Sequence, residues 1–96
     1  MQHKDFDYGR EVTALSEGNH GVGGVCAFSG LVRDMVGDNQ INSMTIEYYP
    51  GMTEKYLAEI EAEAHRRWPL ENTLIIHRYG HLEPGDQIVL VAASSA

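Results

Sequence analysis

Cysteine is nearly absent from this chain of 96 residues, which contains only Cys26. A lone thiol cannot form a disulfide within the chain, so the composition favours a reducing compartment and we expect a cytoplasmic protein. Long apolar runs are also missing. No stretch approaches the roughly 18 apolar residues of a membrane span, and residues 1–7 lack the pattern of a signal peptide. The sequence therefore predicts neither a membrane protein nor a secreted, disulfide-bonded domain.

Basic residues are also scarce. The chain contains seven lysines and arginines and fourteen aspartates and glutamates, which gives a formal net charge of −7. Non-specific binding to nucleic acid requires a basic face, so this balance argues against a nucleic-acid-binding protein. It also argues against binding to an anionic membrane surface. A small anionic ligand remains compatible with the sequence if a few basic groups are concentrated locally.

The length and the remaining composition are those of a globular protein. An apolar fraction of 43% and a charged fraction of 22% are ordinary for such a chain. We expect a single domain that spans residues 1–96. A chain of this size buries roughly 60–70% of the surface that its unfolded form exposes, which leaves little stability to spare.

Hydrophobic periodicity predicts two helices and four strands. Asp7 is the expected N-cap of the first helix, and Pro69 is expected to end the second. We expect a polar loop over residues 33–40 and a turn over residues 83–86, where proline and glycine stand in type II order. The helices are predicted over 7–17 and 52–68, and the strands over 22–32, 41–49, 73–79 and 88–93. This order of elements predicts one α+β domain, with the last strand buried at its centre.

Histidine and cysteine give only weak indications of a metal or catalytic site. His77 and His81 are four residues apart, but they flank the end of a predicted strand instead of sharing a helix face. A metal pair remains open there, although structural roles in a strand and a turn fit better. Cys26 lies within a predicted strand without a basic neighbour, which favours a buried, unreactive thiol.

Arg33 is the strongest candidate for a binding residue. It follows a glycine-rich strand and opens a polar loop, a place where binding residues often lie. Its guanidinium is suited to holding a phosphate through two parallel hydrogen bonds. An exposed loop arginine without a ligand fits the same pattern equally well. Arg78, beside His77, is a weaker candidate of the same kind, and no reaction follows from these residues alone.

A nine-residue block, Glu47–Lys55, identifies a family. It reads EYYPGMTEK and is similar to the E-H/Y-Y-P-G-M-T-E-K signature of the large, catalytic subunit of molybdopterin synthase. Further motifs resemble that family in the same order along the chain: FSGLVR at 28–33, RWPL at 67–70, IHRYGHL at 76–82, PGD at 84–86 and SSA at 94–96. Because the resemblance covers nearly the whole chain, the sequence is identified as a member of this family.

The resemblance implies an α/β-hammerhead-type fold, with a mainly antiparallel sheet and a long helix packed on it, C-terminally truncated relative to the family. It implies a homodimer of large subunits, each binding a small ubiquitin-like sulfur-carrier subunit, to give a heterotetramer. The carrier's C-terminal thiocarboxylate would supply sulfur to cyclic pyranopterin monophosphate, which gives the dithiolene of molybdopterin in molybdenum cofactor biosynthesis. The resemblance implies no metal and no cofactor for this step.

Only part of the family's site carries over. Leu31, Val32 and Arg33 match the family's substrate-contacting segment, and Arg33 stands at an arginine suited to the substrate's phosphate. Leu31 replaces a lysine that is often found in the family. The family's catalytic lysines belong to a further segment, and neither Lys4 nor Lys55 matches them. We therefore expect these three residues to bind substrate and expect no catalytic residue within this sequence.

Three hypotheses follow from the resemblance. The leading one is a sulfurtransferase of the molybdopterin synthase type. The alternative is a catalytically inactive truncated homologue that acts only as a binding or dimerisation module, because sulfur transfer needs cations that stabilise the developing negative charge. In the third, the chain folds only by exchanging strands with another chain, since the apolar strand at 88–93 would lack elements that cover it.

Overall fold

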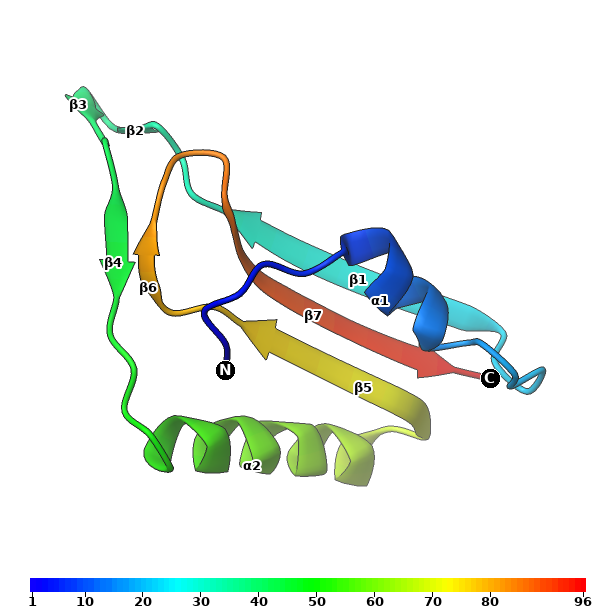
Figure 1. The fold of residues 1–96 in the computed structure, drawn as a ribbon. Helices are drawn as coiled ribbons and strands as arrows, with labels where there is room; N and C mark the ends of the chain where they lie inside the picture. Colours follow the sequence, from blue (N-terminus) through cyan, green and yellow to red (C-terminus); the bar gives the residue numbers. More distant parts are fainter.

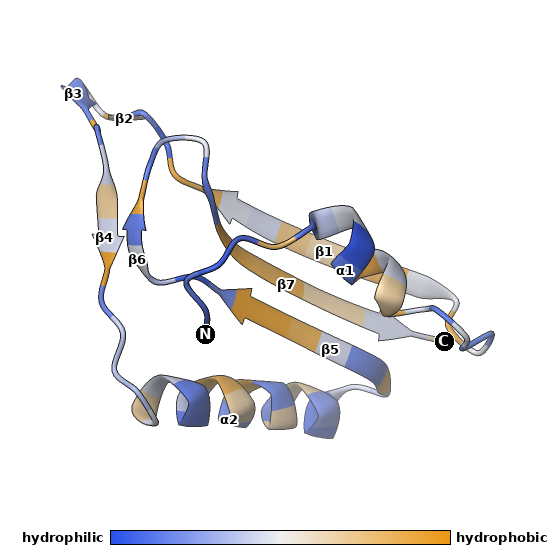
Figure 2. Ribbon diagram, in the orientation of Figure 1, coloured by the Kyte–Doolittle hydropathy of each residue, from blue (hydrophilic) through white to orange (hydrophobic).

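The computed structural model describes residues 1–96 and has a three-stranded antiparallel sheet at its centre (Figure 1). The middle strand is β7 (Gln87–Ser95), which pairs with β1 (Gly24–Leu31) on one side and β5 (Leu70–His77) on the other. Figure 2 shows hydrophobic residues concentrated on β7 and β5. The prediction of an apolar central strand near the C-terminus is confirmed, because β7 has paired neighbours along both edges.

The core lies on one face of this sheet. Side chains alternate along β7, so Leu90 and Ala92 point to the same face, and both are buried. Leu90 lies opposite Ile76 of β5, and Phe6 from the N-terminal segment packs against both. The residues packed around this centre are Val12, Ala27 and Leu74. This face is therefore closed by the N-terminal segment and the helix that follows it.

That first helix, α1 (Tyr8–Ala14), is shorter than predicted but has the predicted cap. Asp7 Oδ1 accepts a hydrogen bond from the backbone N–H of Arg10 at 3.1 Å. Beyond Ala14 the backbone N–H groups of Leu15 and Ser16 bond three residues back instead of four. The last turn thus tightens into 3₁₀ geometry, and the α-helix ends before Glu17.

The long helix α2 (Met52–Arg67) begins where predicted and ends one residue early, with Trp68 as its C-cap. The carboxylate of Glu54 accepts a hydrogen bond from the backbone N–H of Gly51 at 2.8 Å, which caps the start. Figure 1 shows α2 running beside β5. The Thr73 hydroxyl of β5 donates to Glu61 Oε2 of α2 at 2.7 Å and joins the two elements. No helix of the structure has the length and hydropathy needed to cross a membrane.

Two short ladders replace the longer segments expected between residues 33 and 49. The predicted polar loop contains a hairpin of β2 (Met35–Val36) and β3 (Asn39–Gln40), so its prediction as a plain loop is wrong. Gly37 supplies the positive φ of 61° for the hairpin turn. The strand predicted over 41–49 shrinks to β4 (Met44–Ile46) because its only partner is β6 (Gly80–Leu82), which the sequence did not predict.

The opposite face of the central sheet is covered by α2 only beside β5 and is open over β1. Only nine of 96 residues are buried, and the radius of gyration is 15.2 Å, whereas a compact domain of this length has about 12.5 Å. Phe28 of β1 is 65% exposed and Val91 of β7 is 42% exposed. On α2, Ile60 is 58% exposed. The apolar side chains of α2 are therefore only partly covered by the sheet.

Candidate functional site

A cavity of about 670 Å³ lies where β1 ends. Its wall comes from the segment after β1 and from the turn between β6 and β7, and it consists of Leu31, Val32, Arg33, Asp34, Met35, Pro84 and Gly85. The three residues predicted to bind substrate thus line one cavity together. Their role in binding stays a prediction. The sequence did not predict that the Pro84–Gly85 turn would form part of the same wall.

A β-bulge redirects the chain as it enters this cavity. The pairing of Gly30 with Val89 is followed by the pairing of Leu31 with Gln87, so Ile88 has no partner on β1. Such bulges bend a strand and re-aim its side chains. The carbonyl of Ile88 accepts a hydrogen bond from the backbone N–H of Arg78 at 2.8 Å, which satisfies the bulged residue. The bulge ends regular pairing just before the residues that line the cavity.

Val32 anchors the lining segment to the Pro84–Gly85 turn. Its backbone N–H donates to the Asp86 carbonyl at 2.9 Å, and its carbonyl accepts from the Gly85 N–H at 2.9 Å. The side chain of Val32 is almost fully buried, at 3% exposure. Val32 therefore has a structural role in the wall, and it fixes the backbone position of Arg33. These contacts join residues more than fifty positions apart, so only the hairpin and bulge geometry could have revealed them.

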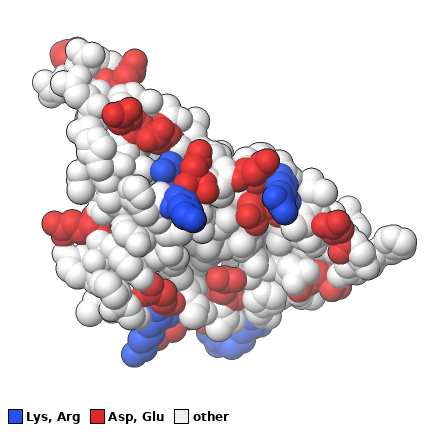
Figure 3. All heavy atoms as spheres, in the orientation of Figure 1, with Lys and Arg blue, Asp and Glu red and all other residues white.

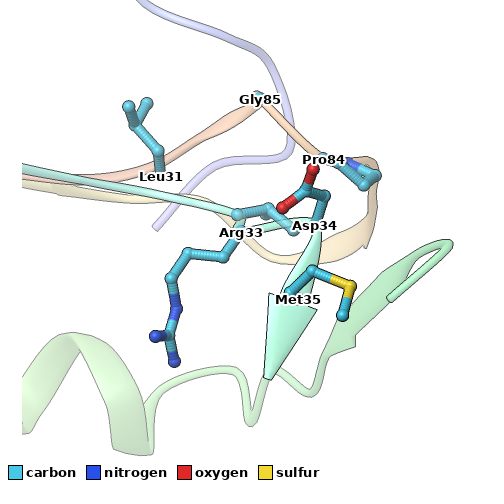
Figure 4. Close-up of a pocket in the computed structure, with 7 residues that line it drawn as sticks. Leu31, Arg33, Asp34, Met35, Pro84 and Gly85 are labelled. Carbon is cyan, nitrogen blue, oxygen red and sulfur yellow. The ribbon is translucent and has the colours of Figure 1, made fainter. Parts of the chain in front are cut away.

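Arg33 and Asp34 point to opposite sides of the lining segment. In Figure 4 the guanidinium of Arg33 extends away from the turn, while the Asp34 carboxylate points toward Pro84. Arg33 is exposed and forms no ion pair or side-chain hydrogen bond. Figure 3 shows acidic groups outnumbering basic groups on the face in view. Lys4, Arg10 and Lys55 also form no ion pair, but none of them lines the cavity. An unpaired guanidinium is available to bind an anion such as a phosphate.

Arg78 is not available for this purpose, contrary to the weaker prediction. It is only 8% exposed, and its guanidinium donates to the carbonyls of His3 at 3.1 Å and Gln87 at 3.0 Å. Asp5 lies 3.7 Å away as an ion-pair partner. The backbone N–H of Phe6, followed by the side chain of Gln87, holds the pKa of Asp5 below its ordinary value. Arg78 therefore fastens the N-terminal segment to the start of β7.

The remaining candidates do not form a site. No cluster of three or more histidine, cysteine, aspartate and glutamate side chains has the geometry to hold a metal ion. His77 lies at the end of β5, where its Nδ1 is 2.8 Å from the Arg78 carbonyl, and His81 lies in β6. Cys26 is exposed, so the prediction of a buried thiol is wrong. It lies on an edge strand and points to the open face of the sheet.

The two lysines lie outside the cavity wall. Lys4 belongs to the N-terminal segment, and Lys55 lies in the first turns of α2, beside Gly51. Arg33 is consequently the one basic residue of the wall. The arrangement can bind and orient one anionic group, but it offers no second cation within the same wall.

Comparison with known proteins gives consistent matches over the full chain. The family model described as "MoaE protein" matches residues 1–96. Proteins described as "Molybdopterin synthase catalytic subunit" are 47% identical over 96 residues in Mesorhizobium japonicum and 49% identical over 96 residues in Pseudomonas aeruginosa. Each alignment covers 100% of this chain but only 59% and 64% of the respective relative. The chain therefore spans less than two thirds of the length of these relatives.

Solved structures show the same similarity. The structure described as "Molybdopterin biosynthesis MoaE protein" from Burkholderia ambifaria has a TM-score of 0.87 and 48% sequence identity, covering 98% of this chain and 60% of that one. The crystal structure of molybdopterin synthase from Staphylococcus aureus has a TM-score of 0.86 at 32% identity, covering 98% of this chain and 67% of that one. The mixed α+β fold with antiparallel sheets is therefore the fold of these proteins.

Proposed function

This chain belongs to the MoaE protein family, and on that basis we propose that it takes part in molybdenum cofactor biosynthesis as a sulfurtransferase of the molybdopterin synthase type. The reaction moves sulfur from the thiocarboxylated C-terminus of a small ubiquitin-like carrier subunit to cyclic pyranopterin monophosphate. The product is the dithiolene of molybdopterin. The proposal includes a homodimer of this subunit with one carrier bound to each copy, acting in the cytoplasm as a single domain over residues 1–96.

Within this reaction we assign substrate binding to the segment Leu31, Val32 and Arg33. The observation that carries the assignment is the unpaired guanidinium of Arg33, held at the wall of the cavity by a segment whose backbone is anchored. A guanidinium binds a phosphate through paired, charge-assisted hydrogen bonds. Leu31 adds an apolar wall, and buried Val32 supports both neighbours.

The alternative is a binding module without turnover, and the relatives, which are catalytic subunits, do not favour it. The cavity wall contains a single cation, Arg33, and neither lysine of the chain lies in it. Stabilising the charge that develops during sulfur transfer normally requires preorganised cations or hydrogen-bond donors. A chain with one such group would retain the ability to hold substrate or carrier and would transfer sulfur poorly.

The test is to join this chain to the family's further segment, to incubate the protein with cyclic pyranopterin monophosphate and thiocarboxylated carrier, and to measure molybdopterin by mass spectrometry. We expect turnover in this protein and a loss of at least about tenfold in Arg33→Gln, because one charge-assisted contact to phosphate is removed. Arg10→Gln is the matched control, since Arg10 is an exposed arginine on α1, away from the cavity wall.

Calorimetry with the carrier separates the two functions. Carrier or precursor binding without product supports the binding module and rejects the enzyme. Product formed equally well by Arg33→Gln and the parent chain contradicts the role assigned to Arg33. Neither binding nor product rejects both functions.

A further inference from the structure

We propose that Asp86 is a positioning residue for Arg33 and that it acts through the turn over residues 83–86. The inference rests on the proposed function, because it concerns how Arg33 is presented to a phosphate. Asp86 does not line the cavity, and it acts on the lining segment through backbone contacts. The resulting chain of contacts runs from its carboxylate to the turn, from the turn to Val32, and from Val32 to Arg33.

The first link is the closure of the turn by Asp86. Its Oδ2 accepts a hydrogen bond from the Glu83 N–H at 2.9 Å, and its own N–H donates to the Glu83 carbonyl at 2.9 Å. An aspartate that bonds nearby backbone in this way stabilises a turn. Gly85 occupies the position that needs a positive φ, at 92°. The shape of the turn thus depends on one carboxylate and one glycine.

The second link is the pair of hydrogen bonds between this turn and the backbone of Val32. Gly85 and Asp86 contribute one backbone hydrogen bond each, a donor from Gly85 and an acceptor from Asp86, and both bonds are 2.9 Å long. They replace the regular pairing that the bulge at Ile88 interrupts. A change in the turn therefore moves the two groups that hold Val32, and with them the backbone of the next residue.

The position of Arg33 depends on these hydrogen bonds because its side chain makes no polar contact of its own. Its guanidinium makes no hydrogen bond or ion pair within the chain, so its position follows from its backbone. The Asp34 carbonyl accepts from the Ile41 N–H at 2.7 Å, but that bond closes the base of the β2–β3 hairpin. Leu31 pairs with Gln87 of β7, and the contacts of Val32 then hold the segment against the turn, directly before Arg33. A small displacement at such a position can weaken binding of a ligand severely.

The role assigned to Asp86 needs a hydrogen-bond acceptor and not a negative charge. Its carboxylate faces the turn backbone, and a negative charge close to a bound phosphate would weaken binding. Asparagine can accept the same bond from the Glu83 N–H, whereas alanine cannot. The pair Asp86→Asn and Asp86→Ala therefore separates the hydrogen bond from the charge.

The experiment measures the affinity of the 96-residue chain for cyclic pyranopterin monophosphate by calorimetry. We expect the Kd to rise about tenfold in Asp86→Ala and to stay within about twofold of the parent value in Asp86→Asn. In the Arg33→Gln background, Asp86→Ala should cause no further loss, because residues that act through one another are not additive. Glu17→Ala, which removes an exposed carboxylate on another part of the chain, is the matched control and should bind like the parent.

A second measurement does not depend on the ligand. Backbone amide relaxation by NMR should show increased mobility at Val32 and Arg33 in Asp86→Ala and unchanged mobility in Asp86→Asn. Gly85→Ala is the reserve variant if Asp86→Ala does not fold. An added Cβ meets no atom within 4 Å there, so its effect comes from the strained φ alone. It should loosen Arg33 and weaken binding in the same direction.

The outcomes separate the two proposals. Binding by the parent that Arg33→Gln weakens but Asp86→Ala does not would overturn only the positioning role. Equal losses from Asp86→Ala with and without Arg33, or a loss in Asp86→Asn as large as in Asp86→Ala, would also overturn it. A parent chain that does not bind the precursor rejects the proposed substrate site, and unchanged mobility at Arg33 in Asp86→Ala then rejects the positioning role by itself.

Discussion

The rings of Tyr48 and Tyr79 stack with their centroids 4.3 Å apart and an angle of 17° between their planes. Tyr48 follows β4 and Tyr79 precedes β6, so the stack closes one end of the short β4–β6 ladder. The two tyrosines also belong to the two longest motifs of the family resemblance. Residues that are separated by a whole helix in the sequence are thereby joined in one contact.

The stack should contribute to the stability of the fold. We expect Tyr48→Ala to lower the free energy of unfolding by about 2 kcal/mol, from lost apolar burial and lost ring contact. Tyr48→Phe should cost less than about 0.5 kcal/mol because the ring remains. Urea denaturation followed by circular dichroism measures both changes. The control is Tyr56→Ala, an exposed tyrosine on α2, and a loss there equal to that of Tyr48→Ala would contradict a specific role for the stack.

Removal of the Arg78 side chain should destabilise the protein by about 2–3 kcal/mol, because the partly buried carbonyls of His3 and Gln87 lose a charged donor. Arg78→Lys should recover only part of the loss, since one ammonium cannot reproduce the geometry of the guanidinium fork. Chemical denaturation gives the free energies, and Arg66→Ala, on the exposed side of α2, is the matched arginine control. Stability of Arg78→Ala close to the parent would show that the N-terminal segment is held by its other contacts.

Asp5 should make stability depend on pH in the acidic range. Its pKa in the folded chain lies below the ordinary 3.8, first through the Phe6 N–H and then through Gln87. A group with a depressed folded pKa stabilises the fold above its unfolded pKa, and this contribution disappears as the pH falls through the folded value. The parent should therefore exceed Asp5→Asn in stability at pH 6, and the difference should shrink at pH 3.

Denaturation midpoints at both pH values test the effect of Asp5. Asp38→Asn, in the β2–β3 turn, serves as the control because Asp38 makes no side-chain hydrogen bond. If the difference between the parent and Asp5→Asn stays constant from pH 6 to pH 3, the link between the Asp5 contacts and stability is wrong.

The open face of the sheet should drive association. Phe28 and Val91 lie opposite each other on neighbouring strands and are exposed on this face. Exposed apolar surface of this kind promotes contact with other chains. We expect Phe28→Glu to reduce concentration-dependent association in sedimentation experiments, with the free energy of unfolding changed by less than about 0.5 kcal/mol. An equal reduction in Gln40→Glu, which adds the same negative charge on β3 outside the central sheet, would attribute the effect to net charge instead.

Local signals in the sequence were sufficient for the elements that depend on neighbouring residues. Asp7 capped α1 as predicted, Pro69 followed the end of α2, and the apolar run of β7 became the central strand. Each of these depends on backbone chemistry or periodicity within a few residues. The α+β class followed from their order, and the family followed from motifs distributed along the whole chain.

Features that require distant partners were missed. The strand predicted to reach Tyr49 stops at Ile46, because a strand extends only as far as its partner β6 does. Cysteine is a residue type that usually lies in the core. At Cys26, however, β1 is an edge strand, and nothing covers this side chain. The cavity joins Arg33 to Gly85 through pairing with a bulge, and periodicity gives no sign of either.

Ile88, which has no partner on β1, divides the central strand β7 into two parts. From Val89 to Ser95 every residue pairs with residues of both neighbouring strands. A shift of the register by one position would turn the apolar residues of the core outward. At the N-terminal end of β7, the extra residue Ile88 accommodates the shift in register between β1 and β7. A change in the length of the segment after β1 should therefore leave the register of the sheet unchanged. The bulge thus marks the boundary between the fixed pairing of the sheet and the segment that lines the cavity.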